Sequence, residues 1–410
     1  MAASASAPSP VRPSSPVRRW LPAIAMLLLS FISYVDRSVL SILSPTILAD
    51  LHLSAQQYGE AILVFSLCYM AANPIWGWVM DRKGLFWTCF AAVGLWSLAS
   101  GSHAMLTGLL TMSVFRGVLG FGEGATFPAG LKTVSETLPA EQRSFGLALA
   151  YSGGSLGAAL TPLIVTPLAI HYGWRAAFVF TAVVGALWLV LWLGLRIAGI
   201  YPPKHAQLVE EVRPVTRWNR DLFATAAIYG LGAAPLAFGL YATPLYLSRV
   251  LHVSQASLGH MLWVPPAGWE VGYLVFGRLS DLRRRRTTSR PFGVFLFLMV
   301  ASFLITVVPM FTSVPVVLTL FFLEMFFAGG FVVFALADGA SVQPKQNAAF
   351  LAGFSISSWA LLTGLLLPWL GRLFDQKHYS ATLWIVSLCP PVGVALWQLL
   401  RRTEMHQMHQ

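Results

Sequence analysis

Residues 77–82 read GWVMDR, and residues 277–282, which lie 200 positions further along the chain, read GRLSDL. Each segment closes an apolar stretch with a glycine and, four residues later, an aspartate, Asp81 or Asp281. The glycine permits close helix approach, and the aspartate can cap the N-terminus of a neighbouring helix. The repetition predicts two halves in which the same helix ends in the same turn.

The composition of the whole chain indicates a membrane protein. Of its 410 residues, 56% are hydrophobic and only 10% are charged, whereas an average soluble domain is about 25% charged. A soluble globular protein is therefore excluded. Twelve apolar stretches of roughly 20 residues, enough to cross a bilayer, are expected to be helices because lipid demands that backbone polar groups be satisfied internally. They cover residues 20–44, 57–80, 85–104, 107–131, 145–170, 176–195, 222–247, 257–279, 291–310, 315–337, 347–370 and 381–400.

The longest polar stretch between these segments, residues 196–221, divides them six and six. Two six-helix halves with a site at their interface form the plan of secondary transporters. One half moves against the other in such a plan, so we assign gating to Asp81, Arg82 and Asp281 at the helix ends. The expected parts are a disordered tail (1–19), an N-terminal half (20–198), a linker (199–220), a C-terminal half (221–400) and a second tail (401–410).

Basic residues are distributed unevenly between the two sides of the predicted bundle. The tails and the loops after the second, fourth, sixth, eighth and tenth helices carry 21 of the 27 Lys and Arg residues, and the opposite side carries 4. The positive-inside rule therefore predicts a multi-pass protein of the cell membrane with both termini in the cytoplasm. This topology accounts for most of the net charge of +11, so no nucleic-acid partner is expected. The run 283–286 (RRRR) is also compatible with binding nucleic acid or anionic lipid.

Four ionisable residues fall within the first and fourth predicted helices, namely Asp36, Arg37, Arg116 and Glu123. Each such charge costs on the order of 3 kcal/mol or more at mid-bilayer unless it is paired or faces a cavity. Arg116 and Glu123 lie two helical turns apart and share one face, whereas Asp36 and Arg37 diverge by roughly 100°. The four residues therefore either form an ion-pair network that holds the two helices together or line a functional cavity.

As a cavity lining, these residues suit a proton-coupled anion site. Their formal charges sum to zero, so protonation of Asp36 or Glu123 leaves a net positive site that can hold an organic anion. Arg37 and Arg116 stay charged and can grip a carboxylate through a two-point fork. We therefore expect the two carboxylates to couple proton movement and the two arginines to bind the substrate.

Two further carboxylates fall in the C-terminal half. Glu270 follows the segment 265–268 (PPAG), which predicts a bent or broken helix that opens to the cavity, so Glu270 is a substrate-binding candidate. A structural pairing of Glu270 is the alternative. Glu324 lies one residue from the position 200 beyond Glu123, and it is either the counterpart of Glu123 in the repeat or a packing acid.

Several segments resemble a known transporter family. Residues 77–84 (GWVMDRKG) resemble the loop signature of the major facilitator superfamily. More specific similarities to its anion:cation symporter family occur at residues 34–37 (YVDR), Tyr69, 115–124 (FRGVLGFGEG), 127–129 (FPA) and 173–175 (GWR). That family includes bacterial hexuronate, galactonate and glucarate transporters and the vesicular glutamate and sialic acid carriers. The resemblance implies the twelve-helix major facilitator fold and substrate-binding roles for Tyr34 and Tyr69.

We expect proton-coupled symport of an organic anion by a monomer that alternates access between the two sides of the membrane. The resemblance implies a sugar acid, such as a hexuronate or an aldonate. The chain departs from the sugar-acid members at residues 355–359 (SISSW), where those members tend to carry asparagines. A proton-driven antiporter or exporter of the same fold is the alternative, because residues 153–162 (GGSLGAALTP) resemble an exporter pattern.

Other functional classes find less support in the sequence. A membrane-embedded enzyme would need a catalytic constellation, yet His52, His103, His171 and His252 fall at segment ends without metal-ligand or triad spacing. The three cysteines also lack metal-ligand spacing, so no metal or cofactor is expected. A channel would have charges of one sign in a ring, whereas these charges oppose one another. No GxxxxGKS or GxxxxGKT loop is present, so the proton gradient is the expected energy source.

Overall fold

The chain is helical throughout the part that the structure describes. The computed structural model describes residues 16–139, 142–200, 218–287, 289–342 and 348–407, and no strand occurs among them. Most of the predicted tail 1–19 and most of the predicted linker 199–220 lie outside the described residues. The expected disorder of the N-terminal tail therefore stays a prediction.

The N-terminal half extends from α1 to α8. Its helices are α1 Pro16–Ile42, α2 Ser44–Asp50, α3 Ala55–Lys83, α4 Leu85–Ser102, α5 Leu109–Glu123, α6 Thr126–Thr137, α7 Arg143–Tyr172 and α8 Trp174–Ile197. Glycines in the left-handed region make two of the tight turns, Gly84 (φ 91°) between α3 and α4 and Gly173 (φ 82°) between α7 and α8. A residue with a side chain adopts this φ only at a cost, so glycine suits both positions.

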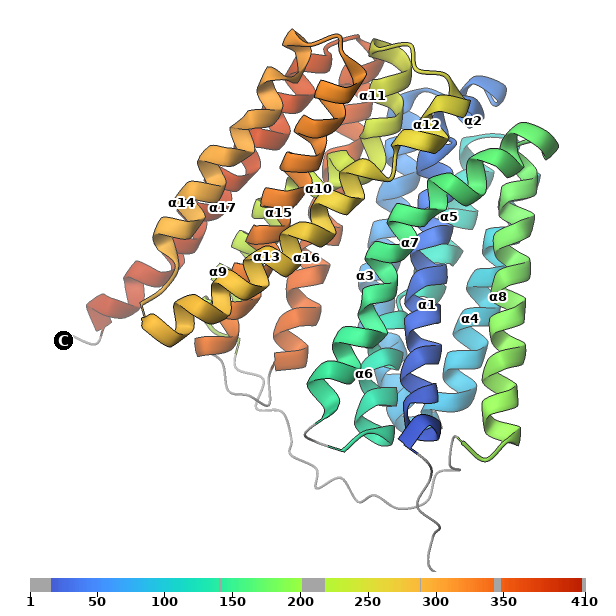
Figure 1. Cartoon of the computed structure of the whole chain (residues 1–410), viewed down its shortest axis with the longest axis horizontal. Helices are drawn as coiled ribbons and strands as arrows, with labels where there is room; N and C mark the ends of the chain where they lie inside the picture. Colours follow the sequence, from blue (N-terminus) through green and yellow to red (C-terminus); the bar gives the residue numbers. More distant parts are fainter. Residues whose placement is uncertain (1–15, 140–141, 201–217, 288, 343–347, 408–410) are drawn as a thin grey trace, which may run out of the picture.

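The C-terminal half extends from α9 to α17 and lies beside the first half (Figure 1). Its helices are α9 Arg220–Gly232, α10 Ala234–Ala237, α11 Thr243–Val250, α12 Gln255–Met261, α13 Val264–Arg286, α14 Phe292–Ser302, α15 Val314–Val342, α16 Ala348–Asp375 and α17 Tyr379–Gln407. A 3₁₀ segment, Phe303–Met310, extends α14. The two-half, all-α fold that the sequence predicts is confirmed.

The twelve predicted membrane segments correspond to nine long helices and three broken ones. Nine helices of the described part are long and apolar enough to cross a membrane, and ten if α9 together with residues 234–250, bent by 44°, is one span. The two other segments are α5 with α6, interrupted at Gly124 and Ala125, and α12 with α13. The last turn of α13 carries four arginines, which lower its apolarity below that of a typical spanning helix.

Prolines stand at the breaks of the C-terminal half. α12 ends at Met261 and α13 begins at Val264, with Pro265 and Pro266 in its first turn, so the predicted break in this segment is confirmed. Proline is tolerated in the first turn because the N–H groups there have no intrahelical acceptor. The sequence does not predict the second break, in which a π-helical turn, Phe238–Ala242, separates α10 from α11.

Close packing of α1 against α7 depends on glycines of the segment 153–162. A Cβ on Gly153 would lie 2.1 Å from the carbonyl oxygen of Leu27, and one on Gly157 would lie 2.6 Å from that of Phe31. No side chain fits at such distances, so these glycines let the two helix backbones touch. The exporter-like pattern therefore has a packing role in this fold.

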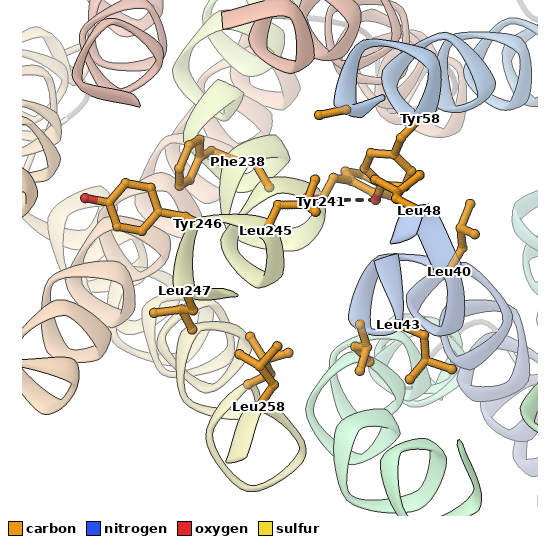
Figure 2. Packing of buried hydrophobic residues seen from close by; sticks show 14 of the residues in the cluster. Leu40, Leu43, Leu48, Tyr58, Phe238, Tyr241, Leu245, Tyr246, Leu247 and Leu258 are labelled. Carbon is orange, nitrogen blue, oxygen red and sulfur yellow. Dashed lines mark hydrogen bonds between the residues drawn. The ribbon is translucent and has the colours of Figure 1, made fainter. Parts of the chain in front are cut away.

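The two halves meet tightly at one end of the bundle. Figure 2 shows buried side chains from α1, α2 and α3 facing those from α11 and the π-helical turn. We call this the sealed end. The other end, at which α1 begins and α13 ends, is called the basic end because the predicted basic loops lie there.

Hydrogen bonds reinforce the sealed end. The Tyr58 hydroxyl donates to the carbonyl oxygen of Tyr241 at 3.2 Å, and Ser41 Oγ donates to that of Leu240 at 2.5 Å. Asp375 accepts from the backbone N–H of Ala55, the first residue of α3, at 2.9 Å. All hydrogen bonds between the halves in the described part lie toward this end, and none is found at the basic end.

Candidate functional site

A cavity of about 500 Å³ lies between the two halves. Its lining begins at Tyr241, next to the sealed end, and reaches Ala148 and Leu336, within two turns of the basic end of their helices. The cavity therefore faces the basic end. Aromatic side chains from both halves dominate its wall, namely Tyr34, Phe65, Tyr69, Phe127, Tyr151, Tyr229, Tyr241, Trp269, Tyr273 and Trp359.

Only two charged residues, Arg37 and Glu270, belong to the described lining. The guanidinium carbon of Arg37 lies 4.4 Å from the ring centre of Tyr69 and 5.1 Å from those of Tyr34 and Phe65. Aromatic faces attract a cation and hold it in place. The N-terminal half thus surrounds one positive charge of the cavity with three rings.

Arg37 is paired from behind by Glu123. Its Nε donates to Glu123 Oε2 at 2.5 Å, and Ser33 Oγ donates to the same oxygen at 3.1 Å. The two Nη groups of Arg37 form no hydrogen bond with any described residue. Because Arg37 lines the cavity, these groups are the donors available to an anion inside it.

Glu123 itself lies outside the cavity wall. Its side chain is fully buried at the end of α5, and its Oε1 has no hydrogen-bond partner among the described residues. A buried carboxylate with one free oxygen is costly when ionised. The ion pair with Arg37 is the compensation that this structure provides.

Asp36 points away from the cavity, toward α4. Ser100 Oγ donates to Asp36 Oδ1 at 2.6 Å and lies 2.8 Å from Thr181 Oγ1 of α8. Asp36 is only 1% exposed, and its Oδ2 lacks a partner in the described part. The adjacent residues Asp36 and Arg37 therefore face different surroundings, as their divergence on a helix requires.

Arg116 is buried apart from the other three charges. It is 1% exposed and does not line the cavity, and its guanidinium carbon lies 5.9 Å from the ring centre of Phe65. No described carboxylate lies within ion-pair distance, and its Nε and Nη2 have no hydrogen-bond partner there. Two helical turns separate Arg116 from Glu123, about 10 Å along α5 toward the sealed end. The structure thus brings Arg37 together with Glu123, but not with Arg116.

Other candidates divide between the cavity and its surroundings. Tyr34, Tyr69 and Glu270 line the cavity, and the Tyr34 ring lies 5.9 Å from that of Trp269 across the two halves. Glu270 has no ion pair among the described residues. Glu324 is buried outside the lining, and neither of its carboxylate oxygens has a partner in the described part.

The serines of the segment 355–359 do not line the cavity. Ser358 Oγ donates to the carbonyl oxygens of Ala226 and Ser355, within the C-terminal half. Trp359 of the same segment does line the cavity, and its Nε1 donates to the carbonyl oxygen of Ala233. The side of α16 that faces the cavity carries Ile356, Trp359, Ala360 and Thr363.

The gating candidates lie at the basic end. Asp81 forms an ion pair with Lys132 of α6, so it contacts a side chain of the neighbouring helix and does not cap its N-terminus. The guanidinium carbon of Arg82 lies 4.3 Å from the Trp78 ring. Asp281 is exposed on α13. These contacts leave the gating roles as predictions.

Sequence reasoning missed several residues of this site. Ser33 lies four positions before Arg37 on the same face of α1, so helical periodicity was a signal that could have found it. Ser100, Tyr229 and Tyr273 carry no such signal, because they come from separate helices that only the fold brings together.

Two helical bundles around a central cavity are the architecture of a secondary transporter. The family model described as Major Facilitator Superfamily matches residues 26–368. The chain belongs to this family, and the relatives that it matches are named as transporters.

Individual relatives refine this comparison. The hexuronate transporter of Bacillus subtilis (strain 168) is 38% identical over 173 residues, which cover 42% of this chain and 41% of the relative. The D-galactonate transporter of Escherichia coli O6:H1 is 25% identical over 424 residues, which cover 95% and 97%. The crystal structure of a bacterial homologue of the human lysosomal transporter Spinster has a TM-score of 0.78 at 15% identity and covers 95% of this chain and 98% of that one. This last similarity shows the fold alone.

Proposed function

We propose that the protein is a proton-coupled symporter that takes up a sugar acid, such as a hexuronate or an aldonate, by alternating access. The observation that carries the proposal is the ion pair between Arg37, which lines the cavity, and Glu123, which is buried behind it. The names of the hexuronate and galactonate relatives support the substrate class. The aromatic wall suits a sugar ring as well, since its C–H faces pack on aromatic rings while hydroxyls reach the serines and tyrosines.

In this proposal the protonation state of Glu123 decides whether the charge of Arg37 is available to the substrate. Ionised Glu123 neutralises the guanidinium through Nε, and protonated Glu123 leaves the positive charge to the substrate carboxylate. The Nη fork of Arg37 then binds the carboxylate in two places. Binding of the proton and of the anion thus favour each other, which is the thermodynamic requirement of symport.

Arg116 and Asp36 supply the second part of the proposed mechanism. An unpaired buried guanidinium has a strong preference for a nearby anion. We infer that Arg116 meets the substrate or a carboxylate of the first half when the sealed end opens and the cavity wall rearranges. Asp36, held by Ser100, is the second proton-coupling carboxylate.

The energy source and setting belong to the same proposal. The proton gradient drives uptake without a cofactor, and the protein acts as a monomer in the plasma membrane. The excess of basic residues at the basic end supports a cytoplasmic location for both termini. The cavity of this structure then faces the cytoplasm.

Transport by purified protein in liposomes tests the proposal. Labelled galacturonate, glucuronate, galactonate, succinate and glutamate are offered with and without an inward proton gradient. We expect accumulation of a sugar acid only with the gradient. If an outward proton gradient drives accumulation instead, the protein is an antiporter. In competition against the labelled substrate, equal inhibition by neutral sugars and by their acids would refute the arginine site. Inhibition by succinate alone would keep the arginine site and refute the sugar acid.

A further inference from the structure

A second cavity, of about 390 Å³, lies at the basic end of the C-terminal half. It is formed by the end of α13, the loop that leads to α14 and the end of α15. It shares no lining residue with the central cavity. Its function is therefore separate from the site described above.

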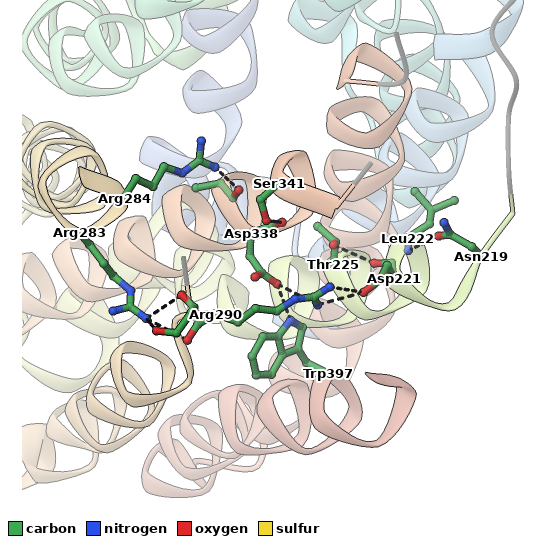
Figure 3. Close-up of polar contacts among 12 residues, drawn as sticks. Asn219, Asp221, Leu222, Thr225, Arg283, Arg284, Arg290, Asp338, Ser341 and Trp397 are labelled. Carbon is green, nitrogen blue, oxygen red and sulfur yellow. Dashed lines mark hydrogen bonds and ion pairs between the residues drawn. The ribbon is translucent and has the colours of Figure 1, made fainter. Parts of the chain in front are cut away.

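Two carboxylates, Asp221 and Asp338, contact Arg290 of the cavity wall (Figure 3). The Arg290 guanidinium lies 2.9 Å from Asp221 Oδ1 and 3.7 Å from Asp338 Oδ2. Asp338 Oδ2 also accepts a hydrogen bond from Trp397 Nε1 at 3.0 Å. The charge of Arg290 is thus compensated within the protein.

Arg283 and Arg284, in contrast, contact only neutral oxygens. Arg283 Nη2 donates to the carbonyl oxygens of Ser289 at 3.0 Å and Arg290 at 2.9 Å, and Arg284 Nη2 donates to that of Ala337. Neither has a carboxylate within ion-pair distance among the described residues. Two uncompensated positive charges therefore stand at the wall of one cavity, where they attract an anion.

The remaining polar groups of the wall are hydroxyls. Ser280, Thr287, Ser289 and Ser341 contribute them from the same three segments that carry the arginines. Guanidinium groups and hydroxyls together are the donors that phosphate oxygens accept from in proteins. We propose that this cavity binds the phosphate headgroup of an anionic membrane phospholipid.

The neighbouring surface favours a lipid over a soluble phosphate. Leu279 and Phe292, which adjoin lining residues in sequence, are 46% and 39% exposed. Phe334 and Val342 add an apolar side to the cavity itself. A phospholipid can place its phosphate against the arginines and its acyl chains along this apolar surface, which a free phosphate cannot do.

Binding to the full-length purified protein in neutral detergent tests the proposal. Dioctanoyl phosphatidylglycerol is titrated and its dissociation constant is measured by thermophoresis, with dioctanoyl phosphatidylcholine, a zwitterionic lipid without net charge, as the comparison. The test variant combines Arg283→Gln and Arg284→Gln. The matched control combines Arg285→Gln and Arg286→Gln, which removes the same charge from the same end of α13 but outside the cavity lining.

We expect phosphatidylglycerol to bind about 30-fold more weakly to the test variant and less than about threefold more weakly to the control. Equal weakening in both variants would indicate a general basic surface and overturn the proposal, as would unchanged binding in both. Glycerol 3-phosphate serves as the soluble probe. If it binds as tightly as the lipid and depends on the same two arginines, the ligand is a soluble phosphate and the lipid assignment is wrong.

A single substitution tests the proposal without disturbing the turn before α14. Arg283 closes the turn before α14 through its two carbonyl contacts, whereas Arg284 contacts only Ala337. Arg284→Gln alone therefore preserves the turn, and we expect it to weaken phosphatidylglycerol binding about fivefold. Binding by this variant that equals the parent's would refute the role of Arg284 even if the double variant fails to fold.

Discussion

Replacing Arg37 with lysine tests the central element of the proposed substrate site. The guanidinium uses Nε for Glu123 at 2.5 Å and leaves two Nη groups for an anion in the cavity. A lysine ammonium keeps the positive charge but is a point donor. It therefore cannot bind Glu123 and also form a two-point contact with the substrate carboxylate. Arg37→Lys should therefore weaken substrate binding although the net charge of the site is unchanged.

The size of the effect follows from the number of bonds lost. Lysine removes at least one charge-assisted hydrogen bond to the substrate, and such a bond contributes about 1.5–3 kcal/mol. A tenfold change in affinity corresponds to about 1.4 kcal/mol. The dissociation constant should therefore rise about 10- to 150-fold.

The assay is calorimetric titration of the detergent-purified variant with the sugar acid that the liposome experiment identifies. Arg196→Lys is the matched control, because the Arg196 guanidinium carbon also lies over an aromatic ring, 4.5 Å from that of Phe86, but outside the cavity lining. An Arg37→Lys affinity within twofold of the parent would refute the fork. So would an equal loss in Arg196→Lys, since the effect would then come from general disturbance of the fold.

Three further predictions concern coupling, gating and pH. Asp36→Asn and Glu123→Gln should each abolish gradient-driven accumulation but leave substrate exchange, because an amide mimics the protonated acid and cannot release a proton. Glu60→Gln is the control. If either variant accumulates as much substrate as this control, its carboxylate is not a coupling site. Asp81→Asn and Asp281→Asn should slow transport in liposomes more than they weaken substrate binding, because both residues lie at the basic end and outside the lining of the central cavity. A loss of substrate affinity at an unchanged transport rate would contradict this. The pKa of Asp50 is lowered from its usual 3.8 by hydrogen bonds from Trp174 and Arg175. Ionised Asp50 therefore contributes fully to stability above pH 3.8, and this contribution is lost as the pH falls through the lowered pKa. Asp50→Asn should therefore lower the Tm more at pH 7 than at pH 2, and an equal loss at both would show that the charge is not the cause.

Hydropathy predicted the helices well because lipid constrains the length and apolarity of each span. The predicted segments 85–104 and 176–195 correspond closely to α4 (Leu85–Ser102) and α8 (Trp174–Ile197). The break between α10 and α11 escaped prediction because a π-helical turn changes hydrogen-bond register without changing composition. Average hydropathy reports burial in lipid, not the continuity of a helix.

The site was less predictable than the helices that carry it. Periodicity correctly suggested that Asp36 and Arg37 face different surroundings and that Arg116 and Glu123 share a face of α5. It could not show that Glu123 pairs with Arg37, because the depth at which two helices meet depends on their packing. The pairing leaves Arg116 nearer the sealed end and outside the cavity.

The two halves contribute unequal chemistry to the cavity. Its arginine and the carboxylate behind it come from α1 and α5, whereas α13 and α16 contribute Trp269, Trp359 and the lone acid Glu270. In the alternating access that we propose, burying an ion pair within one half would keep its desolvation cost constant, because both partners would travel together. The opposite half can then change its aromatic contacts with the substrate at little electrostatic cost. No ion pair between described residues joins the halves at the sealed end, where Tyr58 and Ser41 donate to backbone oxygens and Asp375 accepts from backbone N–H groups. Such bonds are weaker than a buried ion pair, so this end can open at a lower cost.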